Sequence, residues 1–232
     1  MKNNLFLAAI SLSLLWAASC EKAETPISFT FDFAQQQQHS WVAGFADYSD
    51  DYENLDLKAE MAPLPDPLNP SGKITGFKIQ GHNSSDDLFM FIKRKLTGLK
   101  PNQTYHVTAG IQFASDAPKG AVGIGGAPGE SVFLKAGAVM SEPIVRKNTA
   151  GSYRINLDKG NQGQNGRDMR IIGNVAKADD QSGYASITRN AKGIKVTTNA
   201  QGECWLIIGT DSGYEGLTRL YYQKIEVDLT EQ

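Results

Sequence analysis

The chain has few of the residues that build disulfide frameworks or metal sites. It contains two cysteines, Cys20 and Cys204, so the part that follows Cys20 cannot form an internal disulfide. Only three histidines are present, and neither H-E-x-x-H nor a cysteine pair with zinc spacing occurs. P-loop, dinucleotide and EF-hand patterns are also missing. The sequence therefore supports no cofactor and no metal site.

A surplus of positive charge is also lacking. The formal net charge is −2, and because Lys2 is the only charged residue before Cys20, residues 20–232 hold 22 basic against 25 acidic residues. The one tight basic cluster, 93–95, is predicted to be a solvated strand end. Phosphate binding needs a basic field, so we expect no nucleic-acid partner.

No apolar run is long enough to span a bilayer, which takes about 20 residues. The run 5–18 follows Lys2 and ends in Leu15-Trp-Ala-Ala-Ser19 before Cys20. This arrangement resembles a bacterial lipoprotein signal, which is cut before a cysteine that then carries lipid. The alternative is an ordinary secretory signal with Cys20 near the cut.

The resemblance divides the chain into a signal peptide (1–19), a lipidated tether (20–28) and one domain (29–232). It places the protein in the bacterial cell envelope, periplasmic or surface-exposed, with membrane contact only through lipid at Cys20. The oligomeric state stays open.

Most of the remaining sequence has the two-residue period of β-strands. Apolar residues alternate with polar ones from Phe29 to Phe33 and over 105–113, while 88–92 is apolar throughout, as in a strand covered on both faces. Cys204 lies in another buried-looking strand and is predicted to act as a small hydrophobe. Later strands are predicted at 194–198, 204–208 and 221–229, long loops at 121–137 and 158–170, and a weak helical pattern at 171–178. The pattern predicts a single antiparallel β-sandwich.

Three stretches resemble the jelly rolls of carbohydrate-binding modules, the galactose-binding-like sandwiches. They are Phe29-Thr-Phe-Asp-Phe33 followed by Trp41, the turn 97–105, and the closing strand 220–227. Within that turn, the Leu99-x-Pro101-x-x-x-Tyr105 pattern resembles a tyrosine corner. Segments 84–91 and 125–135 are similar to bacterial exported proteins of unassigned function. The module resemblance implies a jelly-roll fold and a structural calcium, but Gln223 stands where an acidic ligand is expected.

Polar residues that suit sugar hydroxyls gather in four segments flanked by glycine. A jelly roll allows these segments to converge at one end or on the concave face, and whether they do so is open; Trp41, Tyr48 and Tyr214 are the candidate stacking residues. Local turn chemistry alone favours the same residue types, so a purely structural role stays open. The predicted ligand-binding residues are Trp41, Asp86, Asp87, Glu130, Lys135, Asp158, Asn161, Asp211 and Tyr214, and Lys159 and Glu215 belong to the same segments.

Three functions are compatible with these patterns. The first is a non-catalytic glycan-binding module, for which the partner is a glycan. The second is an envelope enzyme acting on a glycan through carboxylates, with Glu130, Asp211 and Glu215 as candidates. The third is a structural or assembly lipoprotein whose polar segments order its loops. Convergence around an open pocket favours ligand binding, and closure into a buried network favours structure.

Overall fold

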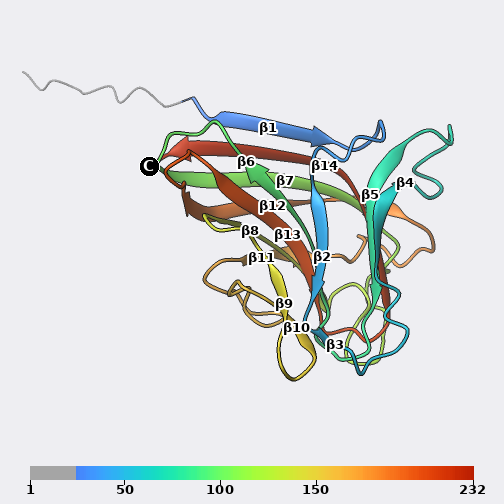
Figure 1. Ribbon diagram of the computed structural model, residues 1–232. Coiled ribbons are helices and arrows are strands. Elements are labelled where there is room, and N and C mark those ends of the chain that lie inside the picture. The colour runs from blue at the N-terminus through green and yellow to red at the C-terminus, as the bar shows by residue number, and fades with distance from the viewer. Residues whose placement is uncertain (1–24) are drawn as a thin grey trace, which may run out of the picture.

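The alternating strands build two antiparallel sheets that face each other, and a small third sheet lies outside them (Figure 1). The computed structural model describes residues 25–232. Sheet A has the order β12-β7-β14-β5-β4, with β1 also beside β14. Its strands are β1 (Ile27–Asp32), β4 (Lys58–Pro63), β5 (Thr75–His82), β7 (Thr104–Ser115), β12 (Ala185–Thr197) and β14 (Leu217–Glu231).

Sheet B has the order β11-β8-β13-β6-β2, and the third sheet, sheet C, has the order β3-β10-β9. Sheet B contains β2 (Val42–Ala46), β6 (Phe89–Leu96), β8 (Val132–Val139), β11 (Arg170–Asn174) and β13 (Cys204–Ser212). Sheet C contains β3 (Tyr48–Ser49), β9 (Val145–Lys147) and β10 (Ser152–Ile155).

The chain passes repeatedly from one large sheet to the other. β5 and β7 lie in sheet A while β6 and β8 lie in sheet B, and β12, β13 and β14 continue the alternation. The main core fills the space between the sheets, and its largest fully buried side chains include Trp41, Tyr105, Phe113 and Tyr222. This arrangement confirms the predicted fold class, an antiparallel β-sandwich of jelly-roll type.

Sheet C covers part of the outer face of sheet B. Phe89 and Phe91 on β6 point away from the main core and form a second apolar cluster with Ile207 of β13. Val145 of β9 and Ile155 of β10 pack against that cluster. This explains why 88–92 is apolar at every position, because both faces of the strand are covered.

Local predictions near Tyr105 and Cys204 are confirmed. The Lys100 N–H donates to the Tyr105 phenol oxygen at 3.0 Å, as in a tyrosine corner. Cys204 is fully buried, and burial raises the pKa of its thiol to about 12. Such a thiol is protonated and inert at neutral pH.

Several boundaries differ from the predictions: the strand expected at 194–198 begins at Ala185, and those expected at 204–208 and 221–229 extend further. The expected loop 121–137 ends early, because β8 begins at Val132, and 171–178 contains strand β11 in place of helical turns. β1 begins at Ile27, inside the range expected for the tether. Cys20 and the predicted signal peptide lie outside the described residues. The described part of the chain holds no helix long and apolar enough to cross a membrane.

Candidate functional site

The predicted polar segments do converge, and Gln162 joins three of them. Its side-chain amide donates to the backbone oxygen of Asp86 at 2.6 Å, and its backbone N–H donates to Asp211 Oδ2 at 2.9 Å. The glycine-rich segment is tied in by a β-bridge between Ile124 and Glu215. Loops that are far apart in sequence therefore meet at one end of the sandwich.

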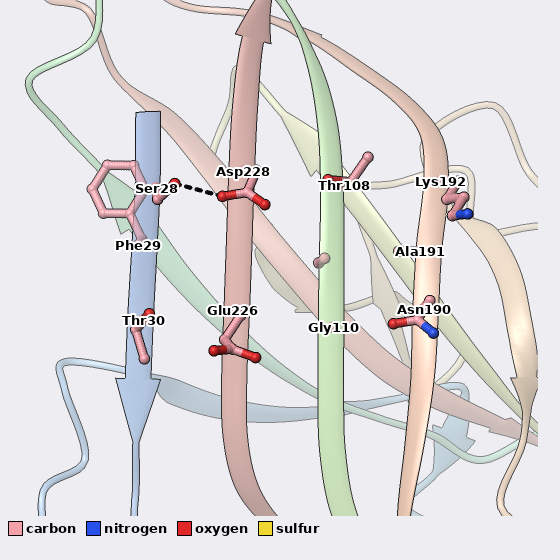
Figure 2. Close-up of a pocket in the computed structure, with 11 residues that line it drawn as sticks. Ser28, Phe29, Thr30, Thr108, Gly110, Asn190, Ala191, Lys192, Glu226 and Asp228 are labelled. Atoms are coloured by element: carbon pink, nitrogen blue, oxygen red, sulfur yellow. Dashed lines mark hydrogen bonds between the residues drawn. The ribbon is translucent and has the colours of Figure 1, made fainter. Parts of the chain in front are cut away.

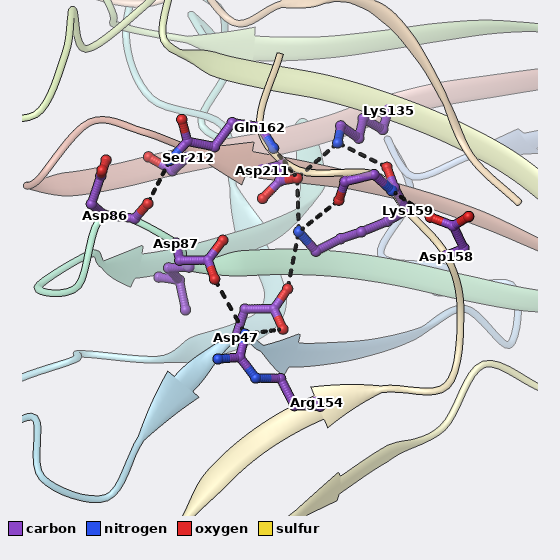
Figure 3. A network of polar contacts seen from close by, with 12 residues as sticks. Asp47, Asp86, Asp87, Lys135, Arg154, Asp158, Lys159, Gln162, Asp211 and Ser212 are labelled. Carbon is purple, nitrogen blue, oxygen red and sulfur yellow. Dashed lines mark hydrogen bonds and ion pairs between the residues drawn. The ribbon is translucent and has the colours of Figure 1, made fainter. Parts of the chain in front are cut away.

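The centre of this meeting point is a buried ion network on the outer face of sheet B (Figure 3). Asp211 on β13 and Lys135 on β8 are both fully buried, and Lys135 Nζ lies 2.7 Å from Asp211 Oδ2. Lys159 Nζ reaches the same oxygen at 2.8 Å. Lys135 also donates to the backbone oxygen of Lys159 at 2.8 Å, which holds the loop after β10 over the sheet.

The network continues outward to the surface as an alternating series of charges. Lys159 Nζ lies 3.0 Å from Asp47 Oδ2, and Arg154 lies 2.9 Å from Asp47 Oδ1 and 3.2 Å from Asp87 Oδ2. With Lys135 and Asp211, the series holds three cations and three carboxylates. Its formal charges therefore cancel, which is the condition under which buried charges are tolerated.

Burial and neighbouring charges perturb several groups in this network. Burial lowers the pKa of Lys135, although Asp211 opposes the shift. Burial acts in the same direction on Lys159, but Asp211 and Asp47 outweigh it and the pKa of Lys159 is raised. Burial, followed by repulsion from Asp47, raises the pKa of Asp87. These shifts come from burial and from the charges within the network itself.

Several predicted ligand-binding residues serve the protein itself. Asp158 accepts hydrogen bonds from the backbone N–H groups of Gly160 and Arg167, which lowers its pKa and orders its own loop. Glu130 Oε1 accepts from Gly120 N–H at 2.7 Å. Asn161 is exposed, as is Asp86.

The three expected stacking residues lie in different surroundings, and of the three Tyr48 lines a sizeable pocket, of about 560 Å³, beside Tyr153. Trp41 is fully buried against Phe31 in the main core, so it offers no stacking face, and the expectation for it is wrong. Tyr48 stacks on Tyr153 with ring centroids 4.5 Å apart. Tyr214 is half-buried, with its ring packed beside Gly216.

Two of the three carboxylates considered for hydrolysis are engaged within the protein. Asp211 is closed off by two lysines, and Glu130 is used within its own loop. Within residues 25–232, no group of three or more His, Cys, Asp or Glu side chains is arranged to hold a metal ion. Gln223, near the expected calcium position, accepts a hydrogen bond from Ser186 Oγ at 2.6 Å.

An open groove of about 710 Å³ crosses the outer face of sheet A. It runs over β1, β14, β7 and β12, as Figure 2 shows, and its polar side chains stand in two rows. Strand register places Ser28, Asp228 and Thr108 side by side in one row. The second row is Thr30, Glu226, Gly110 and Asn190.

Gly110 makes a notch in the second row. Its neighbours across the strands are Glu226 and Asn190, and the space where a side chain would stand is open. A Cβ placed there would meet nothing closer than Asn190 Oδ1, at 3.6 Å. Hydroxyl, amide and carboxylate groups therefore surround a recess in the groove at Gly110.

The sequence predictions missed this groove and part of the network. Asp47, Arg154 and Gln162 were not singled out, and neither were the polar residues of β1, β7, β12 and β14. The outward alternation of these strand residues is visible in the sequence. Which of them are neighbours depends on strand register, and Ser28 and Asp228 are 200 residues apart.

The fold and these surfaces define a β-sandwich protein of jelly-roll type with an open, polar groove on sheet A. No protein-family model matches the chain, and no curated protein is significantly similar to it in sequence. Solved structures of similar architecture include several carbohydrate-binding modules.

One is a xylan-binding domain from Paenibacillus barcinonensis, with 12% identity over 91% of this chain and 99% of that chain and a TM-score of 0.41. Another is a mannohexaose-bound module from Caldicellulosiruptor saccharolyticus, with 10% identity, 85% and 96% coverage and a TM-score of 0.38. A cleaved adhesin domain of Lys-gingipain from Porphyromonas gingivalis has 11% identity, 90% and 99% coverage and a TM-score of 0.35. These similarities concern the arrangement of strands and assign no ligand to this chain.

Proposed function

We propose that the protein is a non-catalytic glycan-binding module of the bacterial cell envelope, anchored by lipid at Cys20. The observation that carries the binding proposal is the groove on sheet A. Its two rows present hydroxyl, amide and carboxylate groups, which are the partners that sugar hydroxyls need. This site replaces the loop cluster that the sequence had favoured, because the cluster is closed by its own ion pairs.

The groove retains hydrogen-bonding capacity for a ligand. Asp228 accepts one hydrogen bond, from Ser28 Oγ to its Oδ1 at 2.6 Å, and Glu226 pairs with Lys224 at 2.6 Å. A carboxylate has about four acceptor positions, so both groups have positions left for sugar hydroxyls. The polar side chains of the two rows are exposed.

Gly110→Val tests the groove without disturbing the core. The new side chain would fill the notch, and valine suits a strand, so we expect the unfolding free energy to change by less than about 1 kcal/mol. Glycan affinity is expected to fall by roughly 2 kcal/mol or more, about thirtyfold in Kd. A glycan array followed by calorimetry with the best ligand measures this loss.

Thr188→Val is the matched control. It places the same side chain on the outer face of sheet A, outside the groove, and should leave the Kd unchanged. Equal binding by Gly110→Val and the unaltered protein would rule out this groove as the site. If the unaltered protein binds no glycan at all, the binding function itself is wrong.

The anchor is supported by the sequence pattern before Cys20. Mass spectrometry of the N-terminal peptide from membrane-isolated protein is expected to show an acylated cysteine at position 20. An unmodified Cys20 in that peptide would contradict the anchor and would leave the groove proposal standing.

A structural or assembly lipoprotein is the second candidate. The observation in its favour is the neutral, buried ion network, in which Asp211 holds two lysines from different parts of the chain. This network orders loops and needs no ligand. Absence of glycan binding, together with a strong stability defect at Asp211, would favour this candidate.

A further inference from the structure

A second, smaller pocket of about 210 Å³ lies where sheet B and sheet A approach each other, between β11, β8 and β12. Its charged lining consists of Arg167, Asp168, Arg170 and Lys195. Three cations and one carboxylate face a common space, although the whole chain carries a net charge of −2. The positive charge is therefore concentrated locally.

The single carboxylate is already engaged. Asp168 accepts a hydrogen bond from the backbone N–H of Asp158 at 2.8 Å and pairs with Arg167 at 3.3 Å. The side chains of Arg170 and Lys195, by contrast, have no hydrogen-bond or ion-pair partner within the part of the chain that the structure describes. Two cations thus line the pocket without a counter-charge.

The pocket and the groove are lined by adjacent residues of β12. Asn190 and Lys192 line the groove, and Gly193 and Lys195 line the pocket. The pairing register between β12 and β7 shifts between Ala191 and Ile194, so Lys192 and Gly193 form a β-bulge at the boundary between the two sets of lining residues. Gly193 has a φ of 70°, which a glycine adopts without strain.

We propose that this pocket binds an oxyanion carried by the glycan, a carboxylate or a sulfate ester on a sugar near the β12 end of the groove. The proposal rests on the glycan-binding function and names its ligand class, an anionic glycan. A guanidinium recognises such groups through paired N–H donors, and an ammonium adds a point charge.

Binding measurements on the purified full chain test this ligand class. The probes are neutral oligosaccharides, uronate-containing and sulfated oligosaccharides, and inorganic sulfate and phosphate. We expect an anionic oligosaccharide to bind about tenfold more tightly than its neutral counterpart at low salt. This advantage should shrink as the salt concentration rises, because exposed charges are screened.

The double variant Arg170→Ala/Lys195→Ala is expected to remove the preference and leave neutral glycans bound as before. Arg146→Ala/Lys119→Ala is the charge-matched control; both residues are exposed and lie outside the groove and the pocket, so the preference should persist. An unchanged preference in the first variant overturns the proposal, as does inorganic sulfate or phosphate binding as tightly as the anionic oligosaccharide.

The two proposals fail in different ways. If the anionic preference is absent while neutral glycans still bind and Gly110→Val weakens them, only the oxyanion pocket is wrong. If no glycan, neutral or anionic, binds the unaltered protein, both proposals are wrong.

Discussion

Asp211→Ala is expected to destabilise the protein by about 3–5 kcal/mol, because it leaves buried cations without their counter-charge. Asp211 is fully buried. Its Oδ2 atom accepts hydrogen bonds from Lys135 Nζ, Lys159 Nζ and the backbone N–H of Gln162. Lys159 keeps Asp47 as a partner, but Lys135 keeps no carboxylate. Urea unfolding followed by tryptophan fluorescence measures the loss.

The loss should depend on pH. Burial lowers the pKa of Lys135, and Asp211 opposes that shift. Without Asp211, the folded state of the variant releases the Lys135 proton more easily than the unfolded state does. The unfolded state then binds more protons, so the stability of the variant should recover as the pH rises toward the ordinary lysine pKa.

A second substitution separates charge burial from packing. Asp211→Ala/Lys135→Met should be at least about 1 kcal/mol more stable than the sum of the two single effects predicts, because it removes the stranded cation. Glu53→Ala is the control: this carboxylate is exposed and should change the stability by less than about 0.5 kcal/mol. Additive single effects would show that Lys135 and Asp211 are not coupled.

Trp41→Ala is expected to cost about 3–5 kcal/mol, through the cavity it leaves in the main core. The indole is fully buried and makes an edge-to-face contact with Phe31, with centroids 5.6 Å apart. Its Nε1 has no hydrogen-bond partner within residues 25–232, so replacing the indole by a phenyl ring breaks no hydrogen bond among these residues. We therefore expect Trp41→Phe to cost less than about 1.5 kcal/mol.

Trp41→Phe also tests the corrected role of this residue. Thermal unfolding followed by circular dichroism gives the stability, and calorimetry gives the Kd for the glycan selected on the array. The Kd should equal that of the unaltered protein, because the indole does not reach the groove. Loss of glycan binding by a folded Trp41→Phe variant would show that Trp41 contributes to the binding site after all.

Features that depend on the two-residue alternation of apolar and polar residues could be predicted from the sequence. Alternation at 29–33 and 105–113 gave strands with the correct inward faces, and the pattern ending in Tyr105 gave the tyrosine corner. β8 was missed, and most of it was assigned to a loop, because Ala136-Gly-Ala138 has small residues on both faces, which hides the alternation. The composition of such a strand resembles that of a loop.

Contacts between distant segments were only partly accessible. Glycines and acidic residues marked four polar segments without showing that they meet. Arg154 pairs with Asp47 across 107 residues, and no local pattern predicts such a pair. The groove depends on the register of four strands that are far apart in sequence. Polar side chains on strands predict an exposed face without showing which of them become neighbours.

The covering of sheet B by β9 and β10 has a consequence for valency. Val145 and Ile155 pack over the outer cluster around Phe89, whereas part of the outer face of sheet A carries the open polar groove. If the groove on sheet A is the binding site, as proposed, each copy engages a polymer through one such groove. Tight attachment to a repetitive polysaccharide then requires avidity, which several copies on one surface would supply by raising the effective concentration of sites.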